Sequence, residues 1–210
     1  MPIDHKESST IFSQREIYKN GGIGRWYWDF RDKTVFSLIK EGQKNILDVG
    51  CGEGVTLEKL ISKYKNSKII HGIDVMEENI KICQDLGLPV TAGSVYDLKP
   101  EKDSVDLCLL LEVIEHLEDV ELALDNIKKV LKKGGEVIIV FPNDFTIKMA
   151  RLFFFKFKGA FADAGHLRKF TPKTLKKLLE SNGFEIVSSK NIPFWLWPVS
   201  LHGIIVAKKI

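Results

Sequence analysis

The sequence predicts a single three-layer α/β fold, in which helices cover both faces of a mostly parallel sheet. From residue 45 onward, short apolar runs alternate with longer amphipathic stretches. Several of these runs are apolar on both faces, as expected of strands buried inside a parallel sheet. A glycine-rich turn at residues 50–54 follows the first run. Open α/β sheets bind their ligands at such a turn, so the fold also predicts where to look for a site.

The elements follow in order along the chain. Strands are expected at 45–49, 68–73, 89–92, 105–111 and 136–141, with helices at 55–65, 77–86 and 120–132 between them. The last of these helices is expected to end before Gly134 and Gly135, and Pro142 stops the strand that follows. Thr171 and Pro172 then open another helix, as its N-cap and first residue. Two closing strands, 184–188 and 204–207, are close enough in sequence to form a hairpin with a long loop.

Composition places the chain among ordinary globular domains. Its 210 residues are 44% hydrophobic and 28% charged, which excludes disordered, collagenous and disulfide-scaffold classes. With 31 basic and 28 acidic side chains, the net charge of +3 does not by itself indicate nucleic acid or an anionic membrane. Three cysteines lie in or beside apolar stretches, and no apolar signal segment follows the first residue. We therefore expect a reduced, cytoplasmic setting.

The N-terminal residues read differently from the rest. Residues 1–32 are interpreted as an extension or lid, and residues 33–210 as the folded domain. A glycine-rich stretch at 21–24 leads into Arg25-Trp26-Tyr27-Trp28, which is very aromatic for a free tail. We expect this segment to pack over another part of the molecule.

The spacing of the glycines in this turn, and the acids near it, indicate which class of ligand the turn binds. A dinucleotide fingerprint would need a third glycine at position 55, which is Val55, and the lysine of a phosphate loop is missing. Asp48, just before the first glycine, would repel a pyrophosphate but can hold an ammonium group, directly or through water. Asp74 lies 24 residues after Gly50, where an acid accepts both ribose hydroxyls. The predicted ligand carries a ribose and a cationic amino group; a plain tight turn capped by Asp48 is the alternative.

Four stretches complete a pattern that resembles class I S-adenosylmethionine-dependent methyltransferases, in the subgroup of the ubiquinone-biosynthesis O-methyltransferases. They are LDVGCGEG (47–54), GIDVMEENI (72–80), LLLEVIEHLED (109–119), and GHLRKFTPKTLKKLLESNGFEIV (165–187) after LKKGGEVIIVFPN (131–143). The resemblance implies a Rossmann-like sandwich with a seven-stranded sheet in the order 3-2-1-4-5-7-6, whose last strand is antiparallel.

The resemblance also implies a cofactor site for S-adenosyl-L-methionine, which leaves as S-adenosyl-L-homocysteine. The family often has Gly-Asp where this chain has Gly93-Ser94, so the adenine contacts are expected from Ser94 and Val95. Glu112 is a candidate for the methionyl end. The expected cofactor-binding residues are Asp48, Gly50, Cys51, Gly52, Asp74, Val75, Ser94, Val95 and Glu112.

Methyl transfer from a sulfonium needs alignment of the two reactants and, for a hydroxyl, removal of a proton. His116, beside the place where the methyl must sit, and His166 are the candidate bases; the alternatives are a helix cap and a structural loop histidine. Glu112, Glu115, His116 and His166 could instead hold a divalent metal, which resembles metal-assisted RNA 2′-O-methyltransferases and catechol-methylating relatives. The Asn/Asp-Pro-Pro-Tyr motif of amino-methylating DNA enzymes is absent, which favours O-methylation.

Aromatic residues gather where this fold has its acceptor pocket. They lie at 26–28, 153–157 and 194–197, and predict a small, hydroxylated, apolar or aromatic acceptor. The alternating lysines and phenylalanines of 147–161 suggest peripheral contact with an anionic membrane. An RNA or protein methyltransferase, with a metal or without, is the alternative, and a nucleic-acid partner is not favoured.

Overall fold

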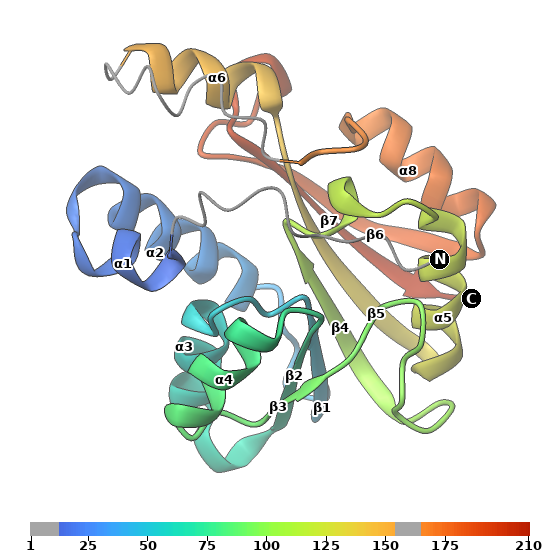
Figure 1. Ribbon diagram of the computed structural model, residues 1–210. Coiled ribbons are helices and arrows are strands. Elements are labelled where there is room, and N and C mark those ends of the chain that lie inside the picture. Colours follow the sequence, from blue (N-terminus) through green and yellow to red (C-terminus); the bar gives the residue numbers. More distant parts are fainter. Residues whose placement is uncertain (1–12, 154–164) are drawn as a thin grey trace.

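The computed structural model describes residues 13–153 and 165–210 and shows one central sheet between layers of helices (Figure 1). The strands are β1 (Asn45–Val49), β2 (Ile69–Asp74), β3 (Val90–Ala92), β4 (Val105–Leu111), β5 (Leu131–Pro142), β6 (Phe184–Ile192) and β7 (His202–Lys209). Their order in the sheet is β3-β2-β1-β4-β5-β7-β6. β7 runs antiparallel to both β5 and β6. The neighbouring strands among the first five, β1 to β5, all pair in parallel. The predicted fold class, strand order and antiparallel last strand are confirmed.

The helices connect these strands. They are α1 (Gln14–Lys19), α2 (Gly22–Phe36), α3 (Val55–Tyr64), α4 (Glu77–Asp85), α5 (Val120–Val130), α6 (Asp144–Phe153) and α8 (Pro172–Ser181), with short 3-10 turns η1 (Lys65–Ser67), η2 (Ile114–His116) and η3 (Trp197–Val199). No helix in the described ranges is long and apolar enough to cross a membrane.

Alternation along the buried strands divides the core into two halves. Ile46 of β1 packs in a cluster with residues of α2, α3 and α4. Leu47, the next residue, packs in the other cluster with residues of α5 and α8. Because successive side chains of a strand point to opposite faces, apolar runs without alternation are buried on both sides. This explains why the central strand β4 has Leu107, Leu109 and Leu110 all fully buried.

The helix predicted to end at residue 132 is shorter, and that prediction was wrong. α5 ends at Val130, and Leu131 pairs with Val105 of β4. Leu131 is fully buried, so burial at the start of β5, inside the sheet, outweighs continuation of the helix. The residues Gly134 and Gly135 lie within β5 as a result. The predicted closing hairpin is present, with both strands longer than expected.

The N-terminal segment packs against the glycine turn. The hydroxyl of Ser13 and the backbone N–H of Arg15 both donate to one carboxylate oxygen of Glu53, at 2.9 and 2.7 Å. The Nε of Arg15 also donates to the Glu53 carbonyl at 2.7 Å. α2 continues from this segment to Phe36, so the proposed division at residue 32 falls within a helix, and it remains a prediction.

Candidate active site

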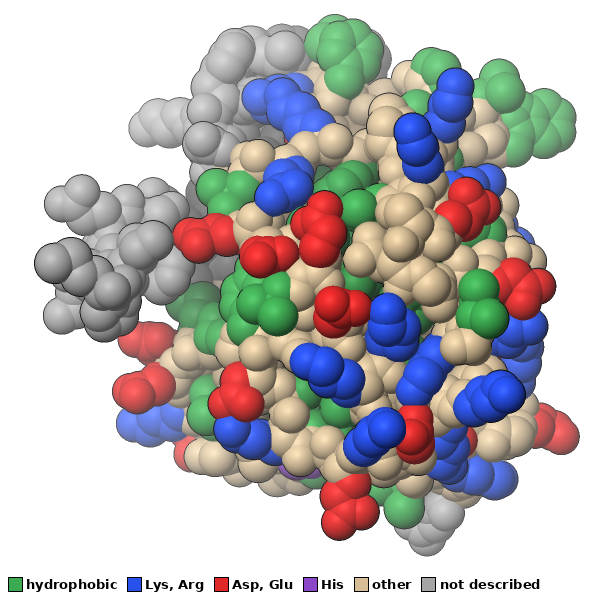
Figure 2. Space-filling view, turned by 90° about the vertical axis from the view of Figure 1, so that its right-hand side faces the viewer, with side chains coloured by type: hydrophobic (Ala, Val, Ile, Leu, Met, Phe, Trp, Pro, Cys, Tyr) green, Lys and Arg blue, Asp and Glu red, His purple; other side chains and the backbone are tan. Residues whose placement is uncertain are grey.

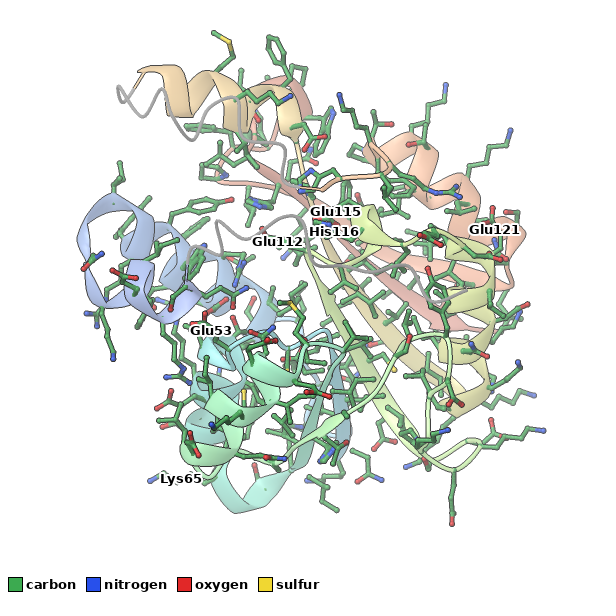
Figure 3. All side chains as sticks on the ribbon, viewed as in Figure 1. Glu53, Lys65, Glu112, Glu115, His116 and Glu121 are labelled. Carbon is green, nitrogen blue, oxygen red and sulfur yellow. The ribbon has the colours of Figure 1, made fainter. Side chains whose placement is uncertain are left out.

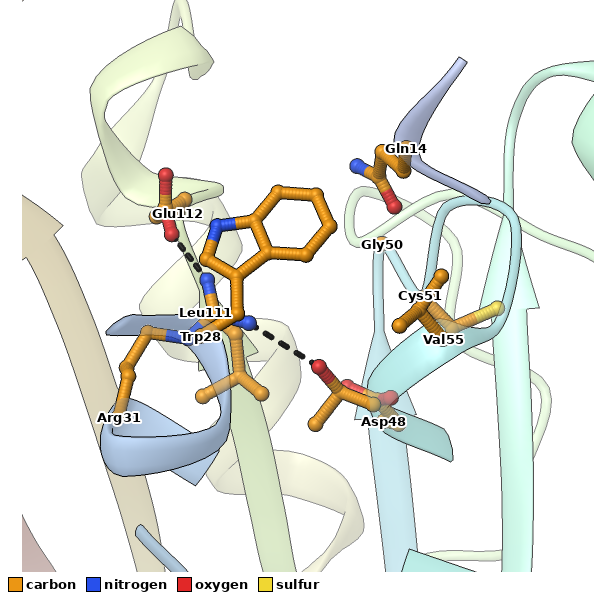
Figure 4. A pocket seen from close by; sticks show the side chains of 10 residues that line it. Gln14, Trp28, Arg31, Asp48, Gly50, Cys51, Val55, Leu111 and Glu112 are labelled. Carbon is orange, nitrogen blue, oxygen red and sulfur yellow. Dashed lines mark hydrogen bonds and ion pairs between the residues drawn. The ribbon is translucent and has the colours of Figure 1, made fainter. Parts of the chain in front are cut away.

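A cavity of about 110 Å³ opens where β1 and β4 end (Figure 4). Its walls come from the glycine turn, the end of β4 and the N-terminal helices. The lining residues are Gln14, Trp28, Arg31, Asp48, Gly50, Cys51, Val55, Thr56, Leu111 and Glu112. Four of these, namely Asp48, Gly50, Cys51 and Glu112, were predicted from the sequence as cofactor-binding residues, and Trp28 was predicted as part of the aromatic lid. Gln14 and Arg31 were missed.

The glycines of the turn are required by close neighbours as well as by backbone shape. Gly50 and Gly52 have φ angles of +71° and +56°, which side-chain-bearing residues rarely adopt. A Cβ on Gly50 would lie 2.6 Å from the side chain of Val113, and one on Gly52 would lie 2.7 Å from the Gln14 amide oxygen. The backbone of the turn therefore lies in close contact with Val113 on one side and Gln14 on the other, where an added side chain would not fit.

Asp74 is the last residue of β2, and its carboxylate holds the glycine turn through a hydrogen bond to the turn backbone. Its Oδ2 accepts the backbone N–H of Gly52 at 2.8 Å, and its Oδ1 accepts the N–H of Met76 at 2.9 Å and the side-chain amide of Asn79 at 3.1 Å. A carboxylate offers about four lone-pair positions, so one remains for a further donor. Its role toward a ribose stays a prediction.

The expected adenine side has a different character. Val75 is 70% exposed, which leaves an apolar surface beside Asp74. Ser94 is half-buried, and its hydroxyl accepts the backbone N–H of Tyr96 at 3.2 Å. Val95 is buried in the core, and its carbonyl accepts the amide of Asn126 at 3.3 Å. Val75 and Ser94 are thus the more accessible of these predicted contacts.

Charges of both signs meet in the cavity. Arg31 is buried and its guanidinium contacts Glu112, while it also donates to Asp32 at 2.9 Å and to Thr56 at 3.0 Å. Figure 4 shows this side chain reaching the end of β4. Burial, followed by the charge of Asp32, raises the pKa of Asp48 to about 7. The cavity therefore combines a buried guanidinium with an acid that a bound cation would ionise, which suits a zwitterionic ligand.

Glu112 occupies a constrained position at the end of β4. Its φ of +59° lies in the left-handed region, and its backbone N–H donates to the Val140 carbonyl at 2.9 Å. The charges of His202 and Arg31 outweigh the effect of burial and lower the pKa of Glu112 well below its ordinary value. A residue held in this strained backbone region costs of the order of 1–3 kcal/mol, and such strain concentrates at functional sites.

A second cluster adjoins this cavity and contains both predicted histidines. Ligand atoms of Glu115, His116 and His166 all lie within 4.8 Å of one another. The two imidazole rings meet edge to face, with centroids 4.9 Å apart. Figure 3 shows Glu112, Glu115 and His116 together beyond the end of β4. Glu112, expected in the same group, is not a member of the cluster among the described residues, because its carboxylate turns to Arg31.

The cluster is assembled by a returning segment of chain. The backbone N–H groups of Leu167 and Arg168 donate to the Glu115 carbonyl at 2.9 and 3.1 Å, which brings His166 beside His116. His166 Nδ1 lies 2.6 Å from an oxygen of Asp144, at the start of α6. The sequence analysis missed Asp144. This residue lies far along the chain from the glycine motif, and no pattern in its neighbourhood marks it as part of a site.

Glu115 is the buried acid of this cluster. It is 1% exposed, and neither carboxylate oxygen has a hydrogen-bond partner among the described residues. Burial, with the nearby charge of Glu112, raises its pKa to about 8. An unpaired buried carboxylate beside two imidazoles fits a divalent cation, because oxygen and imidazole nitrogen are ligands that Mg²⁺, Mn²⁺ and Zn²⁺ accept.

The fold and this site define a class of protein. A sheet of this order, with a glycine turn after its first strand and an acid at the end of its second, is the arrangement of class I S-adenosylmethionine-dependent methyltransferases. The model of a methyltransferase domain family matches residues 27–189. The chain belongs to this family and is an S-adenosylmethionine-dependent methyltransferase, so the predicted enzyme class and cofactor are confirmed.

Curated relatives narrow the subgroup. The chain is similar to a ubiquinone biosynthesis O-methyltransferase of Bartonella bacilliformis, with 26% identity over 181 residues, which are 78% of this chain and 68% of that protein. It is also similar to the mitochondrial ubiquinone biosynthesis O-methyltransferase of Homo sapiens, with 32% identity over 155 residues, which are 67% of this chain and 41% of that protein. The chain therefore spans 41% to 68% of the length of these two relatives.

Solved structures show the same fold. A methyltransferase from Methanosarcina mazei has a TM-score of 0.64 and 21% identity, over 84% of this chain and 97% of that chain. A methyltransferase from Archaeoglobus fulgidus has a TM-score of 0.68 and 18% identity, over 93% of this chain and 98% of that chain.

Proposed function

We propose that the protein transfers the methyl group of S-adenosylmethionine to a hydroxyl of a small, apolar or aromatic acceptor. The observation that carries this proposal is the group formed by Asp144, His166, His116 and Glu115 next to the cofactor cavity. A hydroxyl must lose a proton when its oxygen is methylated, and this group holds proton acceptors at that place. The names of the relatives, which are O-methyltransferases, support the same chemistry.

The cofactor would lie along the ends of β1, β2 and β4. Its carboxylate would bind Arg31, and its ammonium would bind Asp48, whose ionised form that cation would stabilise. Asp74 would accept a ribose hydroxyl at its remaining lone-pair position, with Val75 and Ser94 beside the adenine. This orientation matches each charge of the amino-acid group to an opposite charge of the cavity.

The reaction is an in-line displacement at the methyl carbon. The acceptor oxygen forms the new O–CH₃ bond as the S–CH₃ bond breaks, and its proton passes to the imidazole of His166. Asp144 bonds Nδ1 of His166, which leaves Nε2 as the proton acceptor. Burial and the neighbouring His166 lower the pKa of His116, which favours the neutral form of this imidazole, able to accept a proton.

A divalent metal is the alternative use of the same residues, because an imidazole nitrogen that holds a cation cannot also accept the proton. Glu115, His116 and His166 would hold it, and when bound it would lower the pKa of the acceptor hydroxyl. The buried, unpartnered oxygens of Glu115 are the feature of this chain that favours a cation there. In that state Glu115 would be ionised, and Asp144 would fix the ring orientation of its histidine.

The surroundings favour an apolar acceptor and contact with a lipid surface. Phe145 and Met149 of α6, with Phe194, Trp195 and Leu196 of the β6–β7 loop, are between 51% and 85% exposed. Figure 2 shows apolar side chains projecting at the end of the molecule where α6 and this loop lie in Figure 1. The predicted membrane segment 147–161 and the aromatic stretch 153–157 extend into the residues outside the description. We propose peripheral membrane contact here, and no nucleic-acid partner.

Methyl transfer to candidate acceptors tests the proposal. Purified protein would be given methyl-labelled S-adenosylmethionine with a hydroxylated aromatic lipid, with its O-methyl ether, with RNA, or with protein. Label should enter the hydroxylated lipid alone. Loss of transfer in a chelator, restored by Mg²⁺ or Mn²⁺, would assign Glu115, His116 and His166 to a metal. Label in RNA or protein would contradict the acceptor class, and full activity in the chelator would contradict the metal.

A sedimentation assay tests the proposed membrane contact. The protein should sediment with vesicles that contain anionic lipid and should not sediment with vesicles of neutral lipid.

A further inference from the structure

His202 is a buried histidine that the proposed chemistry does not use. It is the first residue of β7 and is 5% exposed. Its Nδ1 lies 2.6 Å from the hydroxyl of Tyr27 on α2, and the two rings are stacked. Its Nε2 lies 3.6 Å from the carboxylate oxygen of Glu112 that contacts Arg31. Three distant parts of the chain thus meet through one imidazole at the rim of the cofactor cavity.

The partners of His202 fix the position of its proton. The pKa of Tyr27 is raised far above its ordinary value by burial and by the charge of Glu112, so the phenol keeps its hydrogen. Where that hydroxyl donates to Nδ1, a neutral ring carries its hydrogen on Nε2, and a protonated ring carries one there as well. Nε2 is buried without a hydrogen-bond partner in the described parts of the chain, and the Glu112 carboxylate faces it. A shift of about half an ångström would complete this bond.

Glu112 is therefore shared between two donors. Its backbone is fixed by the bond to the Val140 carbonyl, so only its side chain can turn. In the free protein the carboxylate neutralises Arg31, the group that would bind the cofactor carboxylate. When the cofactor takes Arg31, Glu112 loses its cation and faces the neighbouring carboxyl of Glu115, whose pKa it already raises. An unpaired buried carboxylate is costly, and the Nε2–H of His202 is the donor placed to receive it.

We infer that His202, oriented by Tyr27, is a positioning residue that accepts Glu112 when the amino-acid group of the cofactor displaces it from Arg31. This inference rests on the proposed placement of the cofactor carboxylate. It makes affinity for the amino-acid half of the cofactor depend on a side chain of β7. Tyr27 and Arg31 lie one helical turn apart on α2, so the same exchange keeps that helix against the site.

Two amide substitutions at His202 distinguish the roles of its two ring nitrogens. His202→Asn keeps a polar group near Nδ1, for Tyr27, and removes the donor that faces Glu112. His202→Gln keeps an amide near Nε2 and gives up the contact with Tyr27. Calorimetry would measure the Kd of S-adenosylhomocysteine and of 5′-methylthioadenosine, which has the adenosine and sulfur but not the amino-acid group. His71→Asn, on a histidine that bonds Thr91 on the neighbouring strand, is the matched control.

We expect His202→Asn to raise the Kd of S-adenosylhomocysteine roughly tenfold and to leave that of 5′-methylthioadenosine unchanged. His202→Gln should restore most of the affinity. An equal loss for both ligands, or no loss for either, would overturn the inference. If the histidine variants do not fold, Tyr27→Phe decides the matter, because it removes one oxygen and should weaken only S-adenosylhomocysteine. Arg31→Gln in the same assay tests the cofactor placement: an equal effect on both ligands would refute that placement, whatever the His202 variants do.

Discussion

Asp48→Asn should stabilise the free protein and weaken the cofactor complex. Asp48 is 2% exposed, and its pKa rises from an ordinary value of 3.8 to about 7, chiefly through burial and then through the charge of Asp32. Asparagine has the same shape without the charge. The substitution therefore removes a buried acid that only a bound cation would offset.

Proton binding by Asp48 determines whether the free energy of unfolding rises or falls with pH. Between about pH 4 and pH 7 the folded protein binds the Asp48 proton more tightly than the unfolded chain does, so the free energy of unfolding falls as pH rises. The fall amounts to about 1.4 kcal/mol for each pH step, or at most about 4 kcal/mol across the interval. The contribution is fully present below the unfolded pKa and lost above the folded one. Asp48→Asn should be nearly neutral at pH 4 and stabilising by up to about 4 kcal/mol at pH 8.

Urea unfolding at pH 5, 6, 7 and 8 would measure this effect in the absence of cofactor. Asp125→Asn is the control, because that carboxylate is 53% exposed on α5 and forms an ion pair with Lys128. Free energies that fall in parallel for the wild type and Asp48→Asn would refute the reasoning. In the same variant the Kd of S-adenosylmethionine should rise by roughly ten- to a hundredfold, because the ammonium loses a charged partner.

Three further substitutions test other parts of the structure. Asp74→Ala should weaken cofactor binding by roughly 1–3 kcal/mol through lost hydrogen bonds, and calorimetry that shows unchanged affinity would reject the ribose assignment. His166→Asn should slow methyl transfer by roughly 10² to 10⁴ while S-adenosylhomocysteine still binds; a wild-type rate would make this histidine structural. Gly203→Ala would bring a Cβ within 2.3 Å of the Phe141 ring and should destabilise the fold by roughly 1–3 kcal/mol in a urea melt, where Gly24→Ala, with open space around it, should not.

Much of the fold was readable because its signals are local. The apolar run of β4 and the Thr171-Pro172 start of α8 each depend on residues near one another in sequence. The end of α5 was misjudged because that boundary depends on a distant residue: Leu131 leaves the helix to pair with Val105. Propensity favoured two more helical residues, and burial in the sheet decided otherwise.

From the sequence, the glycine turn and its acids predicted a ligand with a ribose and a cationic amino group, and the resemblance of the motifs predicted the methyltransferase class. Only the folded chain shows which charges meet in the site. Arg31 reaches Glu112 across 81 residues, and Tyr27 reaches His202 across 175. Such pairs leave no periodic trace in a single sequence, because the sheet order, and not the distance along the chain, places their elements side by side.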